Sequence, residues 1–142
     1  MPIQQGATNA FKTGLATGTF NFNTDTFKIA LYTGAADIGP TTGAYTALNE
    51  TTGTGYTAGG ELLTVSVAPT VGVTGGYVAY LSFNDVTWNP AAFTCRGAII
   101  YKVGGGNPTV CILDFGADKT CTTQFQVQFP TANNTSAIIR IA

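Results

Sequence analysis

The residue types that most often carry out catalysis are scarce in this sequence. Its 142 residues contain no histidine, which is the commonest general base and metal ligand. Nucleophilic catalysis by a serine or cysteine paired with histidine is therefore excluded. Asp114 and Asp118, close to Lys119, are the nearest carboxylates with a suggestive neighbourhood. Two acids need a cleft that raises the pKa of one of them, so we predict no enzyme and no catalytic residue. A small glycan hydrolase using Asp114 or Asp118 is the enzymatic alternative.

A glycine-rich segment, residues 53–60 (GTGYTAGG), contains the GxGxxA spacing of dinucleotide-binding loops. In those loops the glycines open a helix whose N-terminus meets the pyrophosphate. Here they lead into residues 61–67, where apolar and polar side chains alternate as in a strand. We therefore predict a flexible, close-packed loop and no cofactor.

Oxygen-bearing side chains alternate at Asn21, Asn23 and Asp25, as they do at the start of an EF-hand calcium loop. The remainder of the pattern is missing, because Thr26 stands at the glycine position and Tyr32 at the position of the bidentate glutamate. We predict a hairpin turn here and no metal site.

Cys95, Cys111 and Cys121 are an odd number of cysteines with wide spacing, unlike the CxxC pairs of zinc sites. A free thiol in a β-rich segment usually behaves as a small buried hydrophobe, which is the role we predict. The spacing leaves open whether any two of them pair.

Two other features have alternative interpretations. Trp88 is expected in the core, and a platform that stacks on glycans is the alternative. Gln124, Gln126 and Gln128 form a neutral polar row on a predicted strand. Neutral amides can hydrogen-bond across a subunit contact without the desolvation cost of a charge, so an interface and a plain solvated face are both open.

The composition limits the classes of function. Charged residues make up 9% of the chain, against about 25% in average soluble domains, while hydrophobic residues make up 44%. A disordered chain would have fewer apolar residues, so we expect a folded protein. With six Lys and Arg, a net charge of −1 and no apolar run of roughly 20 residues, we predict neither nucleic-acid binding nor membrane insertion. Residues 1–6 lack the pattern of a signal peptide, so we expect synthesis in the cytoplasm.

The sequence predicts a single domain, residues 1–142, with a mobile N-terminal tail at residues 1–7. Thr8 or Asn9 is predicted to cap a short helix through Ala16, with Phe11 and Leu15 on one face. A glycine just past the predicted end is typical of a helix C-cap.

The rest of the sequence predicts β-structure. A hairpin is expected from residues 19–22 and 27–32, followed by a long excursion, residues 34–60, with one short strand near 44–48. Further strands are predicted at residues 61–67, 77–83, 93–103, 110–115, 124–129 and 138–141. In the longest, residues 93–103, we expect Phe93, Cys95, Ile99 and Tyr101 on one side. About eight short strands and a short N-terminal helix indicate an all-β fold, an antiparallel β-sandwich or jelly roll.

Six segments resemble small structural proteins encoded in the genomes of tailed bacteriophages. They are residues 9–12 (NAFK), 25–33 (DTFKIALYT), 53–60 (GTGYTAGG), 86–88 (VTW), 98–102 (AIIYK) and 113–116 (LDFG). The resemblance extends over most of the chain, to residues 139–141, and its motifs are structural rather than catalytic.

The resemblance implies a virion component, in particular an accessory head protein that decorates or cements the outside of the capsid. The implied partners are the major capsid protein and further copies of the chain, with a trimer favoured. The implied location is the virion, after synthesis in the host cytoplasm. The alternative is a tail or fibre module that recognises a host receptor or glycan. We expect residues 1–16 and the mobile central loop, residues 34–60, to make the contacts.

Overall fold

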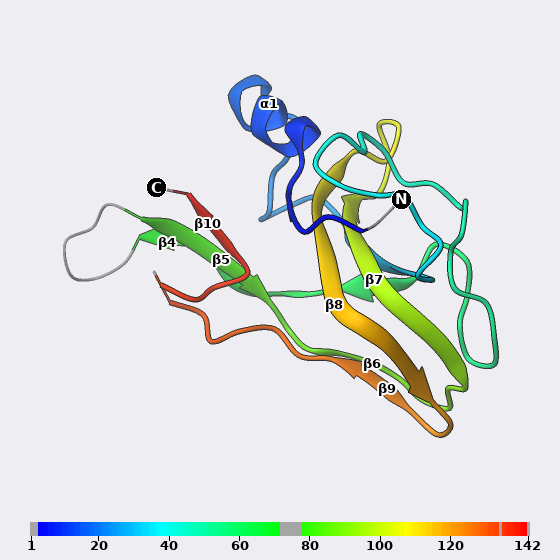
Figure 1. The fold of residues 1–142 in the computed structure, drawn as a ribbon. Helices are drawn as coiled ribbons and strands as arrows, with labels where there is room; N and C mark the ends of the chain where they lie inside the picture. The colour runs from blue at the N-terminus through cyan, green and yellow to red at the C-terminus, as the bar shows by residue number, and fades with distance from the viewer. Residues whose placement is uncertain (1–2, 72–77, 134, 142) are drawn as a thin grey trace.

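The computed structural model describes residues 3–71, 78–133 and 135–141 (Figure 1), and within them the predicted all-β, sandwich-like fold is confirmed. These residues form one helix, α1 (Asn9–Thr17), and ten strands. The strands are β1 (Gly6–Ala7), β2 (Phe27–Tyr32), β3 (Glu61–Leu63), β4 (Val65–Val71), β5 (Ala79–Phe83), β6 (Val86–Trp88), β7 (Phe93–Lys102), β8 (Thr109–Cys121), β9 (Phe125–Val127) and β10 (Ile139–Ile141).

The strands form three antiparallel sheets. The main sheet has the order β1-β8-β7-β2-β3, a second has the order β10-β5-β4, and β6 pairs with β9 in a two-stranded ribbon. The chain passes from β5 into β6, so the ribbon continues the second sheet beneath the main one (Figure 1).

The centre of the main sheet is buried on both faces, which explains the apolar run of residues 29–32 in β2. Ile29 and Leu31 point into the inter-sheet core, which lies between the main sheet and the other two. Ala30 and Tyr32 point into a second cluster, the loop-side core. That cluster is covered by the N-terminal residues and by the excursion after β2, which contributes Ile38.

The predicted facing of side chains on β7 is wrong beyond its first half. Phe93 and Cys95 lie in the inter-sheet core, whereas Ile99 and Tyr101 lie in the loop-side core. The pairing of β7 with β8 shifts register between Cys95 and Gly97, which moves the alternation by one residue. After the shift, Ala98 and Ile100 face the inter-sheet core in place of the odd-numbered residues.

The helix begins where the sequence predicts and ends at Thr17, one residue beyond the predicted Ala16. The Thr8 side chain accepts a hydrogen bond from the Phe11 N–H, and its own hydroxyl donates to the Thr109 carbonyl of β8. Gly18 ends the helix in the left-handed conformation, with φ 74°. The cap therefore also attaches α1 to the main sheet.

The predicted buried face of α1 is only partly right. Phe11 is buried, but Leu15 is 41% exposed, and Gly14 takes its place against the core. A β-carbon at Gly14 would lie 2.4 Å from the ring of Phe20, so only glycine allows this close approach.

The prediction of a mobile tail at residues 1–7 is corrected for the part that the structure describes. Ile3 is 5% exposed within the loop-side core, and the Gln4 N–H donates to the Ile38 carbonyl at 2.9 Å. Gly6 and Ala7 then pair with β8 as the edge strand β1. An apolar side chain in a core and a strand pairing hold this arm in place. Residues 1–2 lie outside the described residues.

Two predicted strands do not form as strands. Residues 19–22 instead lead into a turn, with Phe20 and Phe22 packed against Phe27 in an aromatic cluster. In the central excursion the short strand predicted near residues 44–48 is reduced to one bridge, between Ala44 and Pro108. Burial of the aromatic rings, rather than strand pairing, fixes the first of these segments. The predicted strand at 77–83 begins at β5, and Tyr77 lies outside the described residues.

Candidate functional site

Trp88 is a core residue, as predicted. Its side chain is 2% exposed and packs against Tyr56, Phe93 and Phe125, with ring centroids 5.9 to 6.4 Å apart. Its Nε1 has no hydrogen-bond partner among the described residues. A ring buried in this way offers no face to a sugar, so the glycan-stacking interpretation of Trp88 is wrong.

Asp114 and Asp118 lie on β8, on either side of Gly116. The Asp114 carboxylate accepts a hydrogen bond from the Gly116 N–H at 2.9 Å, and the Asp114 N–H donates to the Gln5 side chain at 3.0 Å. Asp118 is exposed. Asp114 therefore takes part in capping backbone groups along the open edge of β8.

The calcium-like segment is a turn, as predicted, but it is not the turn of a hairpin, because residues 19–22 form no strand. The Asp25 carboxylate accepts from the Asn21 N–H at 2.8 Å and pairs with Lys102 Nζ at 3.2 Å. The hydrogen bond from Asn21, together with Lys102, lowers the pKa of Asp25 below its usual value. The Asn21 side chain accepts from the Asn23 N–H, so these oxygens serve the backbone of the turn.

The glycine-rich segment 53–60 is a close-packed loop, as predicted. A β-carbon at Gly55 would lie 1.9 Å from the Pro90 carbonyl oxygen, and one at Gly60 would lie 1.9 Å from that of Ile29. Both glycines have positive φ, 83° and 85°. The glycines thus let the loop backbone pack closely against the main chain at Pro90 and Ile29, rather than against a phosphate group.

The best-built polar cluster in the described residues, the Glu50 anchor, fixes this loop, and the sequence reading missed it. Glu50 is 9% exposed and accepts hydrogen bonds from the Tyr45 hydroxyl at 2.6 Å, from the Tyr56 hydroxyl and from the Gly59 N–H at 2.8 Å. Tyr101 of β7 donates to the Gly59 carbonyl at 2.6 Å. These five residues are the Glu50 anchor, and they attach the excursion to the sheet.

The tyrosines of the Glu50 anchor are fixed hydrogen-bond donors. Burial, followed by the hydrogen bond to Glu50, raises the pKa of Tyr45 and Tyr56 well above the usual value. Their hydroxyls therefore keep their protons throughout the neutral range. Tyr56, within the glycine-rich segment, was a signal that the sequence offered. The sequence did not indicate which carboxylate would accept a hydrogen bond from its hydroxyl.

The cysteines are free thiols. Cys95 and Cys111 are buried, as predicted, and burial raises the pKa of each thiol to about 12. Cys121 is only partly buried, and its Sγ approaches the Phe93 carbonyl oxygen at 3.6 Å. Thiols with a raised pKa are poor nucleophiles, which fits a packing role.

The glutamine row is exposed on and around β9, opposite Val127. Gln126 donates to the Thr87 hydroxyl on β6, and Gln128 donates to the Gln126 side chain. Gln124 accepts from Asn89 at 3.3 Å. The row is thus a hydrogen-bonded ladder on the surface, which leaves both of its interpretations open.

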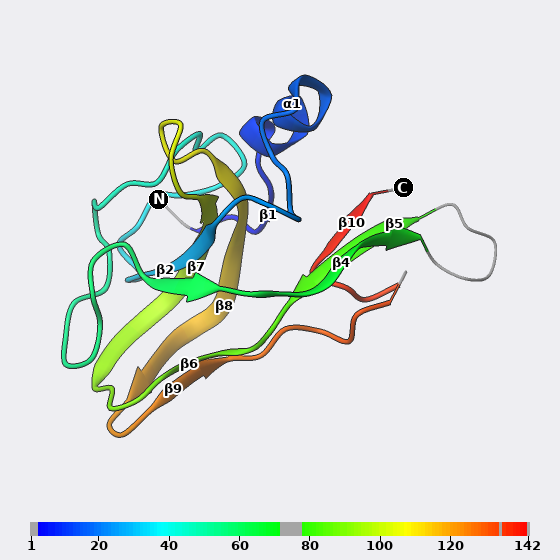
Figure 2. The same cartoon turned by 180° about the vertical axis from the view of Figure 1, so that it is seen from behind.

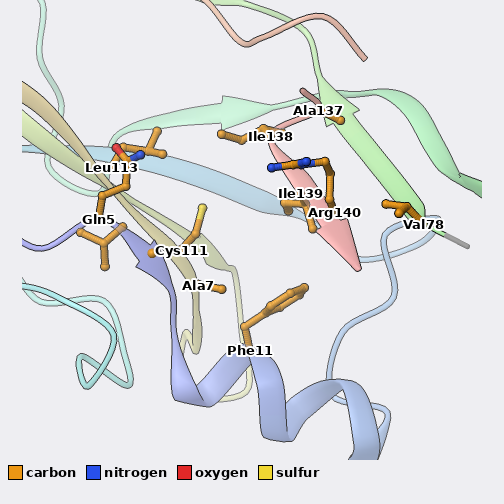
Figure 3. A pocket seen from close by; sticks show the side chains of 12 residues that line it. Gln5, Ala7, Phe11, Val78, Cys111, Leu113, Ala137, Ile138, Ile139 and Arg140 are labelled. Carbon is orange, nitrogen blue, oxygen red and sulfur yellow. The ribbon is translucent and has the colours of Figure 1, made fainter. Parts of the chain in front are cut away.

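The main concave feature is the β8–β10 cleft, which lies between α1, the β1–β8 edge and β10 (Figure 3). Its volume is about 430 Å³, and the side chains of Phe11, Cys111, Leu113 and Ile139 converge on it (Figure 3). Arg140 is the charged residue among those that line it. A smaller hollow of about 210 Å³ shares Leu113 with it and extends the groove along β8. The walls of the groove thus combine apolar side chains with polar side-chain and backbone groups.

Features that would assign an activity directly are missing from the described part of the chain. It holds no group of three or more His, Cys, Asp or Glu side chains placed to bind a metal ion. None of its helices has the length and apolarity to cross a bilayer. No protein-family model, curated protein or solved structure matches the chain.

Proposed function

We propose that this chain is a non-enzymatic structural protein of a phage virion, which decorates the outer surface of the head. The observation that carries the proposal is the β8–β10 cleft, which presents apolar side chains beside the polar groups of Gln5, Arg140 and the backbone. A cleft of this kind gains free energy by covering apolar surface, at about 25 cal/mol per Å². It offers no arrangement of groups for bond-making chemistry.

The low charge of the chain supports the same role. Charged residues amount to 9% of the sequence, so a large contact can form with few ion pairs to desolvate. The resemblance to structural proteins of tailed phages points in the same direction. Each copy would bridge neighbouring capsid subunits and add buried area that opposes the pressure of packaged DNA. An interface of about 1,000 Å² per site, repeated over the shell, gives a stable coat.

The Glu50 anchor adds a second supporting feature. The excursion after β2 was expected to be mobile, but it is bonded to the sheet. The Leu31 N–H of β2 donates to the Tyr56 hydroxyl, and Tyr101 of β7 donates to the Gly59 carbonyl. A preformed loop loses less conformational entropy on binding than a mobile one. The excursion after β2, held rigid in this way, therefore remains a suitable element for contact with the capsid shell.

The proposal is tested by adding the purified chain to capsids assembled without it. We expect saturable binding and a higher temperature of capsid disruption. Arg140→Gln and Leu113→Gln alter the cleft and are expected to weaken binding by about tenfold or more, or 1.4 kcal/mol. Val103→Gln is the matched control, because Val103 is 40% exposed and lies outside both the cleft and the excursion after β2.

Thermal unfolding of each variant shows whether the loss of binding reflects loss of the fold. Absence of binding by the folded wild-type chain would contradict the proposal. The tail or fibre alternative predicts binding to a host surface component instead, and a receptor or glycan screen with the same variants separates the two.

A further inference from the structure

The inter-sheet core is incompletely covered along one side of the molecule. Five large apolar side chains that pack against this core are only partly buried: Leu113, Phe115, Phe125, Phe129 and Ile138. They belong to β8 and to the stretch from β9 to β10. Figure 2 shows these two walls separating after the turn that joins them, as β8 rises toward α1 and the stretch from β9 runs to β10.

Three hollows follow one another along this side and form the β8 groove, lined on the β8 side by residues 111–115 and Lys119. The β8–β10 cleft and the hollow of about 210 Å³ share Leu113, and that hollow shares Phe115 with a third one of about 260 Å³. Leu113 and Phe115 are two residues apart, which is about 6.6 Å along a strand. An extended peptide lying along β8 repeats its side chains at the same interval, so alternate side chains would enter successive hollows.

The two ends of the β8 groove are cationic. Arg140 lines the first hollow, where its side chain extends from β10 toward β8 (Figure 3), and Lys119 lines the third. Neither forms an ion pair within the described residues. Asp114 lines the middle hollow, and its carboxylate accepts a hydrogen bond from the Gly116 N–H. A partner complements these charges when it carries a carboxylate near each end and none in its middle.

We propose that the β8 groove binds an extended peptide segment of the capsid shell, with apolar side chains at alternate positions and a carboxylate near each end. The inference rests on the proposed function and names the part of the shell that this site recognises. The carboxylates pair with Arg140 and Lys119, while the apolar side chains cover the partly buried residues of the core. Each Å² of apolar surface covered in this way contributes about 25 cal/mol.

Side chains of the groove supply the hydrogen bonds to the backbone of the bound segment. Gln5 already accepts from the Asp114 N–H and Asp114 from the Gly116 N–H, so β8 offers no continuous free ladder there. Gln126 and Gln128 line the third hollow, and their amides can both donate and accept. The glutamine row then serves as part of an interface, which is one of its two open interpretations.

The test uses capsids that are assembled without the chain and then saturated with it. A water-soluble carbodiimide joins amines to carboxylates that lie in contact, and mass spectrometry of the digested particles identifies the joined residues. We expect Lys119 to be joined to an acidic residue of the shell protein, in a product that the free chain does not give. Lys28 of β2 is the internal control, because it is partly exposed and lines none of the three hollows.

Charge variants give a second readout on the same capsids. Lys119→Gln is expected to weaken capsid binding by about threefold or more, as Arg140→Gln does at the other end of the groove. Each variant should also reduce the loss of affinity that the wild type shows as salt is raised, because one screened ion pair is missing. Lys28→Gln is the matched control and should bind like the wild type at every salt concentration. Thermal unfolding of each variant checks that the fold is intact.

The outcomes separate this inference from the proposed function. If the folded wild-type chain does not bind capsids, both are wrong. If it binds, but Lys119 is joined to no shell residue and Lys119→Gln and Arg140→Gln bind like the wild type, the proposed function stands and the inference is overturned. A product that joins Lys119 to a second copy of the chain in the absence of capsids would also overturn it, because the groove would then hold another copy.

Discussion

A single carboxylate organises the longest irregular part of this chain. Glu50 has no cationic partner among the described residues, and hydrogen bonds from Tyr45, Tyr56 and Gly59 stabilise it instead. A buried carboxylate is costly unless it is hydrogen-bonded in this way. The charge therefore has a structural use, which is to hold the excursion after β2 against the main sheet.

Removing one hydroxyl from this cluster should lower stability. Tyr56→Phe removes the donor to Glu50 and the acceptor of the Leu31 N–H, so we expect the free energy of unfolding to fall by about 1–3 kcal/mol. Urea denaturation measures the loss. Tyr80→Phe is the control, since the Tyr80 hydroxyl makes no hydrogen bond within the described residues. Equal effects of the two variants would contradict the assigned role of Tyr56.

The Asp25 turn makes a pH-dependent contribution. The hydrogen bond from Asn21 and the Lys102 ion pair lower the pKa of Asp25 in the folded state, so the unfolded state binds its proton more tightly. This stabilisation is present above the unfolded pKa of about 4 and is lost as pH falls through the folded pKa. Asp25→Asn should therefore lower stability at neutral pH and have less effect at pH 3.

The control for this pH dependence is Asp37→Asn, because Asp37 is exposed. Thermal unfolding of the wild type and both variants between about pH 7 and pH 3 separates the two sites. A constant difference between wild type and Asp25→Asn at every pH would contradict the assigned cause.

At the scale of elements, glycines with positive φ in this chain differ in how closely they pack against neighbouring atoms. Gly60→Ala adds a β-carbon 1.9 Å from the Ile29 carbonyl oxygen, whereas at Gly104, with a similar φ of 97°, no atom lies within 4 Å. We expect Gly104→Ala to cost about 1–2 kcal/mol, the penalty for positive φ alone. Gly60→Ala should cost several kcal/mol more or prevent folding, and urea denaturation compares them. Equal losses would show that close packing does not matter at Gly60.

Local patterns predict the elements that depend on local physics. The Thr8 cap, the Gly18 end of α1 and the Asn21–Asp25 turn follow from residue types at fixed spacing, and all three are found. The side-chain patterns of β2 and β9 likewise follow from burial, which involves both faces of β2 and one face of β9.

Features that depend on contacts between distant residues were missed. The register shift at Gly97 depends on how β8 pairs, and the position of Ile3 depends on a core formed by distant strands. The partners of Glu50 lie five, six and nine residues from it, which follows neither the helix nor the strand period. The contact that completes the anchor, between Gly59 and Tyr101, joins residues 42 positions apart. The fold class was therefore predictable, while the facing of β7, the N-terminal arm and the Glu50 anchor were not.

At the scale of the whole molecule, the described surface offers contacts rather than chemistry. The β8–β10 cleft presents apolar side chains beside Arg140, and the Glu50 anchor attaches the excursion after β2 to the main sheet. Together these features fit a protein that is one part of a larger assembly.

The central claim concerns where this protein resides. The most direct measurement is quantitative mass spectrometry of purified phage particles whose genome encodes the chain. The account predicts a copy number close to that of the major capsid protein. Absence from the particle, or a handful of copies confined to the tail, would contradict it.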